Sequence, residues 1–200
     1  MSFRLDSAQW AKQQFADCKL GDKRRTKRLI QVAEQVANHP SGSFPQQIRD
    51  WGDLKAAYRL FDQDDVTFAA IASPHWKQTC DVGAGSYLVL GDTTEIDFGY
   101  DPDIEGISAL GDGSRYGFLL HNALLVEAET ESLLGVAGQT IHYRKRAPKK
   151  ENKAQRFKRE RESRVWSDVI EQIGPPPQDA QFIHVFDRGA DDFKVFCRLR

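Results

Sequence analysis

Two aspartates follow short apolar runs of the kind found in buried strands. Asp92 comes after the run at residues 87–90, and Asp187 comes after the run at residues 182–186. Two ionised carboxylates a few Å apart repel each other unless cations bind between them. A pair of Mg²⁺ ions would remove this repulsion, activate a water and stabilise the leaving oxygen of a phosphodiester. Asp92 and Asp187 are therefore predicted metal ligands if their strands are neighbours.

The alternative is that each aspartate only caps the turn or helix after its strand. This alternative is the better interpretation for a single strand-end aspartate, but two of them at paired positions favour the metal. Histidines and cysteines are weaker candidates, because they show no ligand spacing with one another. His121 is predicted to be a strand residue near the site, whereas His184 alternates with core residues and is interpreted as structural.

A second candidate site is a run of positive charge. Five cations occupy the six positions of residues 23–28, namely Lys23, Arg24, Arg25, Lys27 and Arg28. They fall in the first turns of a predicted helix, where cations oppose the helix dipole at a cost of a few tenths of a kcal/mol each. A DNA phosphate backbone at that end would explain the arrangement. The alternative is a solvated helix face, screened by Asp17, Asp22 and water.

Composition narrows the class of protein. The chain has 200 residues, of which 40% are hydrophobic, with 28 Lys and Arg against 29 Asp and Glu. This composition argues against disorder, and no apolar run approaches the roughly 18–20 residues of a membrane span. The first ten residues lack the layout of a signal peptide, and three distant cysteines do not form a disulfide framework. We therefore expect a cytoplasmic protein without a membrane partner. Residues 144–164, with eleven cations and three carboxylates, form a second basic segment.

Hydrophobic spacing predicts helices before residue 80. Ser7 is expected to cap the first helix, and Leu20 with Gly21 to end it. The second helix is expected to start near Asp22 and to stop at residues 38–42. Its apolar residues follow the i, i+3, i+4, i+7, i+8 spacing of one buried face. These residues are Leu29, Val32, Ala33, Val36 and Ala37.

Two further helices are expected in this region. Ser43 and Gln46 predict a capping box, and Thr67 predicts the cap of the next helix. That helix is expected to be interrupted or kinked near Pro74. The helix that follows the capping box is expected to bury Trp51, Leu54, Tyr58 and Phe61.

After residues 83–85 the period changes to that of strands. Strands are expected at residues 87–90, 118–127, 133–143 and 182–186, and a helix carrying Val165, Trp166 and Ile170 is expected before the last strand. A final helix is expected to begin near Asp191. Three antiparallel strands, a crossover helix and a parallel fourth strand form the opening of a ribonuclease-H-like fold. In this topology the fourth strand lies beside the first, so Asp92 and Asp187 become neighbours.

Six segments, in the same order along the chain, resemble bacterial cut-and-paste transposases of the insertion-sequence "four" family. The group around the transposase of composite transposon five is the most similar. Collinear order makes the resemblance specific, since each segment alone is a weak signal. The segments are residues 20–29, 56–61, 91–95, 117–126, 161–166 and 186–191.

The resemblance implies a helical DNA-binding domain at residues 1–75 and an incomplete ribonuclease-H-like catalytic domain at residues 76–200. Asp92 and Asp187 then correspond to the first two members of an Asp-Asp-Glu triad that binds Mg²⁺, for which Mn²⁺ can substitute. Thr93, His121 and Arg188 are expected to support this site. The implied partners are double-stranded DNA, both transposon end repeats and target DNA, and a second copy in the complete protein. The implied location is the bacterial nucleoid.

One feature departs from the family pattern. The sequence has no Tyr-x-x-Arg-x-x-x-Glu signature, so the third carboxylate of the triad is not found. The chain is therefore expected to be the front part of a transposase and inactive in cleavage alone. If a third ligand is present after all, Glu95, Asp97 and Asp191 are the first candidates. The alternative function is a non-catalytic DNA-binding fragment that occupies transposon ends.

Overall fold

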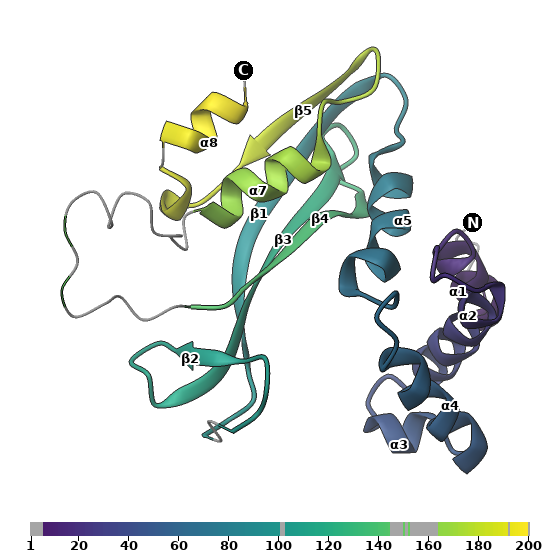
Figure 1. Ribbon diagram of the computed structural model, residues 1–200. Helices are drawn as coiled ribbons and strands as arrows, with labels where there is room; N and C mark the ends of the chain where they lie inside the picture. Colours follow the sequence, from purple (N-terminus) through teal and green to yellow (C-terminus); the bar gives the residue numbers. More distant parts are fainter. Residues whose placement is uncertain are drawn as a thin grey trace. The chain divides into compact units, whose positions relative to one another are not determined.

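The computed structural model divides the chain into two compact units, Met1–Gln78 and Thr79–Arg200 (Figure 1). It describes residues 6–100, 103–144, 150, 152, 164–191 and 193–199. The first unit is helical, and the second is built on a mixed sheet. Each unit has buried hydrophobic clusters of its own.

The first unit begins with helices α1 (Ser7–Phe15) and α2 (Lys23–Asn38). Asp6, not Ser7 as predicted, caps α1, because its carboxylate accepts a hydrogen bond from the backbone N–H of Gln9 at 2.7 Å. The helix also ends earlier than predicted, at Phe15. The predicted start of α2 is confirmed, since Asp22 accepts from the N–H of Arg24 at 2.8 Å. The predicted apolar face is also confirmed, with its first three members buried.

Helices α3 (Phe44–Gln47), α4 (Trp51–Phe61) and α5 (Phe68–Cys80) follow. The predicted capping box at Ser43 and Gln46 is present, with the Ser43 N–H donating to the Gln46 side chain at 2.8 Å. Thr67 accepts from the N–H of Ala70 at 3.1 Å, which confirms the cap predicted for α5. The helix is not interrupted at Pro74 but continues to Cys80.

The buried face of α4 differs from the prediction. Leu54 is buried as expected, but Trp51, Tyr58 and Phe61 are 65%, 50% and 43% exposed. Ala57 and Leu60 are buried instead. Leu54 and Ala57 pack in one cluster with Val32 and Ile48, so the small Ala57 lets α4 approach its neighbours closely and rotates the large rings outward.

The second unit contains a five-stranded sheet. Its strands are β1 (Gly85–Asp97), β2 (Ser108–Leu110), β3 (Arg115–Glu127), β4 (Leu133–His142) and β5 (Ala180–Val185). The order is β2-β3-β1-β5, and β4 also pairs with β3. Only the β1–β5 pair is parallel among the strands described. The predicted placement of the last strand beside the first is thereby confirmed. Strand β2 was not predicted, because three residues are too few for a periodic signal.

Helix α7 (Arg164–Ile173) covers one face of the sheet (Figure 1). Its Val169 joins a buried cluster with Val89 of β1, Ala123 and Leu125 of β3. Its Trp166 joins a second cluster with Val195 of the last helix, α8 (Phe193–Arg198). The short helix η1 (Arg188–Ala190) connects β5 to α8. These contacts fix the position of β5 and of the residues just beyond it.

The opposite face of the sheet is more open. Side chains alternate between the two faces of a strand, so Leu88, Leu90 and Asp92 lie on the face opposite buried Tyr87 and Val89. Leu88 and Leu90 are half-buried, and their partners on β5, Ile183 and Val185, are exposed. Asp92 therefore stands at the open face, where a ligand can reach it.

Candidate functional site

Asp92 and Asp187 occupy corresponding positions on parallel neighbours. Leu90 of β1 is paired with Val185 of β5, and each aspartate lies two residues beyond its member of this pair. Both aspartates are exposed, and both carboxylates act electrostatically on the ring of His121. Asp187 follows the carboxyl end of β5, whereas Asp92 lies within β1, opposite Asn122 of β3, because β1 continues to Asp97 and does not end near residue 90 as predicted. The parallel register still brings two hard oxygen donors to the same part of the sheet.

Asp187 also has the capping role that is the alternative to metal binding. Its Oδ1 accepts a hydrogen bond from the backbone N–H of Gly189 at 2.7 Å, at the start of η1. An ionised carboxylate carries about four lone-pair sites, so one capping bond leaves sites for a cation. The cap fixes the orientation of the carboxylate and does not conflict with metal binding.

His121 lies beneath Asp92, on the covered face of the sheet. It is 1% exposed, its Nδ1 lies 2.8 Å from Thr93 Oγ1, and its ring centroid lies 4.1 Å from that of Trp166. Burial lowers the pKa of His121 to about 4, against the opposing effect of Asp92 and Asp187. The ring is therefore neutral at pH 7. His121 and Thr93 support the strand from below and do not themselves present charge to a ligand.

The other acidic candidates do not join the pair. Glu95 forms an ion pair with Arg144 at 3.4 Å, and Asp97 forms one with Arg115 across the β1–β3 ladder. Within residues 6–100, 103–144, 164–191 and 193–199, no three His, Cys, Asp or Glu side chains gather as a metal site. Arg188, predicted to support the site, is the exposed first residue of η1, next to Asp187. Among the described residues, the candidate metal site therefore consists of two carboxylates, those of Asp92 and Asp187.

The basic run of α2 separates into two groups. Arg25 donates to the Leu20 carbonyl at 3.0 Å, to Asp65 at 2.9 Å and to Gln63 at 2.9 Å. Arg28 is ion-paired with Asp53 of α4, and Arg24 with its own cap, Asp22, at 3.0 Å. Arg25 and Arg28 thus connect α2 to distant parts of the same unit. They have a structural role that the sequence did not reveal.

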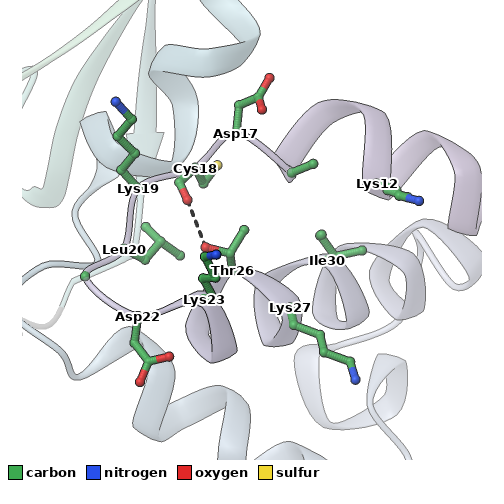
Figure 2. Close-up of a pocket in the computed structure, with 12 residues that line it drawn as sticks. Lys12, Asp17, Cys18, Lys19, Leu20, Asp22, Lys23, Thr26, Lys27 and Ile30 are labelled. Carbon is green, nitrogen blue, oxygen red and sulfur yellow. Dashed lines mark hydrogen bonds between the residues drawn. The ribbon is translucent and has the colours of Figure 1, made fainter.

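The lysines of the run are arranged differently. Lys23 and Lys27 are exposed, and neither forms an ion pair with a residue that the structure describes. Both line a hollow of about 670 Å³ at the junction of α1 and α2 (Figure 2). Lys12 and Lys19, which also line it, were missed in the sequence because they lie outside the run. The turn between the two helices brings them to the same place.

The second basic segment lies mostly outside the described residues. At its ends, Arg144 is paired with Glu95, and Arg164 is paired with Asp168 one turn later in α7. The thiols of Cys18 and Cys80 are poor candidates for a nucleophile or a metal ligand, because burial raises the pKa of each to about 11 and keeps the thiol protonated. Neither feature adds a residue to the two candidate sites.

Comparison with known families concerns the first unit. Residues 7–66 match the family model described as transposase DNA-binding. The match covers α1 to α4, the basic run and the lysine-lined hollow. It supports a transposase N-terminal domain in this chain and DNA as its partner. None of the helices described is both long and apolar enough to cross a membrane.

Proposed function

We propose that this chain acts in DNA transposition, as a transposase of the insertion-sequence "four" type. Its first unit binds double-stranded DNA at transposon ends, and its second unit is the opening of a ribonuclease-H-like catalytic domain. The observation that carries the proposal is the match of residues 7–66 to transposase DNA-binding domains. The sheet that follows supports it, because the β1–β5 register gives Asp92 and Asp187 corresponding positions.

Asp92 and Asp187 are the residues that would hold a divalent cation, Mg²⁺ or Mn²⁺. Carboxylate oxygens are the ligands that such hard cations prefer, and both side chains are exposed. A bound cation would supply a Lewis acid for phosphodiester cleavage. The protein's own part is to hold both carboxylates in place, through the cap at Gly189 and the packing of His121 under β1.

A second candidate function is DNA binding without catalysis. It is favoured by the finding that no group of three possible metal ligands gathers among the described residues, so Asp92 and Asp187 have no third described ligand beside them. A misplacement of about 1 Å already costs on the order of a hundredfold in rate, and a lost ligand should cost more. We therefore expect residues 1–200 to bind duplex DNA and not to cut it. In a chain that also carries the third carboxylate, Asp92→Ala or Asp187→Ala should abolish cleavage and leave DNA binding intact. The proposed function also includes dimerisation, in which two copies of the complete protein hold a pair of transposon ends.

The experiment has two parts. Selection of bound sequences from a random duplex library tests whether the chain prefers a particular end sequence. Incubation of the selected duplex with the chain and Mg²⁺ or Mn²⁺ tests cleavage, with Asp92→Ala as the control. Failure to bind any duplex DNA contradicts the proposed function. Metal-dependent nicking that disappears in Asp92→Ala shows instead that the site is already complete within residues 1–200.

A further inference from the structure

The hollow between α1 and α2 is bordered by lysines from three consecutive parts of the first unit. Lys12 comes from α1, Lys19 from the connecting loop, and Lys23 and Lys27 from α2. All four are exposed. They are separated along the sequence but line one surface, which gives the hollow a concentrated positive charge. Such a surface attracts polyanions.

The acids at the hollow do not neutralise these lysines. Asp22 is engaged by Arg24, through the side-chain ion pair at 3.0 Å and through the helix-capping bond. Asp17 also lines the hollow, so four lysines face two carboxylates, one of which already has a cationic partner. The excess of positive charge is therefore available to a ligand.

The uncharged lining of the hollow does not suit the reading of base edges. Apart from the charged residues, the lining includes the apolar side chains of Ala16, Leu20 and Ile30. The hydroxyl of Thr26 donates its only proton to the Cys18 carbonyl at 2.8 Å, so it has no donor left for a base (Figure 2). Sequence is read by hydrogen bonds to base edges, whereas phosphates are held by charge. The hollow thus has the chemistry of a phosphate-holding surface.

The spread of the lysines argues for an extended ligand. In Figure 2 the side chains of Lys19 and Lys27 extend toward opposite sides of the hollow. A single phosphate would need donors that converge on one point, while a phosphodiester chain presents charges at regular intervals. Lysine is a flexible point charge, which suits a backbone contact without fixed geometry.

We propose that Lys12, Lys19, Lys23 and Lys27 form a binding track for the phosphodiester backbone of duplex DNA, independent of base sequence. Arg25 and Arg28 take no part in the track, because they hold α2 against the 63–65 loop and α4. The inference rests on the proposed DNA-binding function and assigns the residues that carry it out. It adds Lys12 and Lys19 to the interface.

The test compares charge removal at the track with equal charge removal elsewhere in the same unit. The track variant is Lys12→Gln with Lys19→Gln, and the control is Lys55→Gln with Lys77→Gln, two exposed lysines of α4 and α5. Binding of the full chain to a fluorescent mixed-sequence duplex is measured across a series of salt concentrations. Each lost phosphate contact reduces the slope of log affinity against log salt by about 0.9, so the track variant should lose about 1.8.

Further variants define the outcome. Removing all four lysines should lower the slope by about 3.6, again by about 0.9 per contact, and Lys12→Arg with Lys19→Arg should keep the wild-type slope because charge is retained. Circular dichroism identifies any variant that fails to fold. If the double glutamine variant does not fold, the single variants Lys12→Gln and Lys19→Gln decide, since each should lose about 0.9 of the slope. If the track variant and the control both keep the wild-type slope, the track is wrong while DNA binding stands. If the wild type binds no duplex, the proposed function fails, and the track fails with it.

Discussion

Arg28 in α2 is ion-paired with Asp53 in the first turn of α4. The pair joins two helices that are separated in the sequence by α3, and its side chains are 32% (Arg28) and 40% (Asp53) exposed. Within the same basic run, Arg24 is paired with Asp22, but its side chain is 92% exposed. Two arginines of one helix thus form ion pairs that contribute differently to stability, since solvent screens an exposed pair more strongly.

We predict that the Arg28–Asp53 pair stabilises the first unit by about 0.5–1 kcal/mol, the upper part of the range for partly exposed pairs. The measurement is a double-mutant cycle with Arg28→Ala and Asp53→Asn, read from hydrogen exchange of the α2 and α4 amides in the whole chain. The control cycle, Arg24→Ala with Asp22→Asn, keeps the helix cap and should give a coupling near zero. Equal coupling energies in both cycles would contradict the structural role of Arg28.

A second prediction concerns the buried face of α4. Leu54 is buried in a cluster with Val32, Ile48 and Ala57, so Leu54→Ala should cost about 2–4 kcal/mol of unfolding free energy. Trp51 is mostly exposed, with the Lys55 ammonium 5.1 Å from its ring centroid, so Trp51→Ala should cost less than about 1 kcal/mol. Exchange rates of the α4 amides give both values. A larger loss of unfolding free energy for Trp51→Ala than for Leu54→Ala would contradict the observed burial and favour the buried face that the sequence predicted.

These residues show what the sequence can reveal and what it cannot. The start of α2 was predictable because a cap is local, and so was the β1–β5 neighbourhood, because apolar runs and a crossover helix restrict the topology. The partners of Arg25 and Arg28 were not predictable, since Asp65 and Asp53 are brought close only by tertiary packing. The predicted buried face of α4 was wrong, because the helix packs through small Ala57 and through Leu54 and Leu60, and not through its large rings.

The candidate sites follow the same division. Asp92 and Asp187 could be identified because each follows its apolar run closely, and the register then gives them corresponding positions. The run at residues 23–28 could be identified as a local concentration of charge. Lys12 and Lys19 could not be identified, because the turn between α1 and α2 decides whether they line the same hollow as Lys23 and Lys27.

A third prediction concerns the close packing beneath Asp92. A Cβ added at Gly91 would lie 2.7 Å from Phe186 and 3.1 Å from Trp166. Both rings belong to or pack against a buried cluster and cannot move aside easily, so Gly91→Ala should destabilise the second unit by about 1–3 kcal/mol. The matched control is Gly83→Ala, where an added Cβ has no described atom within 4 Å. Urea unfolding checks both variants. A Gly91→Ala protein as stable as the control would mean that the rings pack less closely.

The fourth prediction concerns pH and His121. Burial places its pKa at about 4 in the folded chain, below the ordinary value of 6.5. Between these two values the unfolded chain binds more protons than the folded one, so acid favours unfolding. The stabilisation from neutral His121 is fully present above pH 6.5 and is lost as the pH falls toward 4. The slope is at most about 1.4 kcal/mol per pH unit.

The check combines an NMR titration of the His121 ring with urea unfolding at about pH 7 and about pH 5. Burial also lowers the pKa of His75 and His184, so the wild type alone does not isolate His121. His121→Gln retains a polar side chain beside Thr93 but cannot titrate, and the difference between the two proteins removes the shared contributions. We expect the variant to lose stability at pH 7 and to depend less on pH between 7 and 5. An unchanged pH dependence, or a ring that titrates near its ordinary value of 6.5, would show that His121 is reached by water and does not form the dry support beneath Asp92.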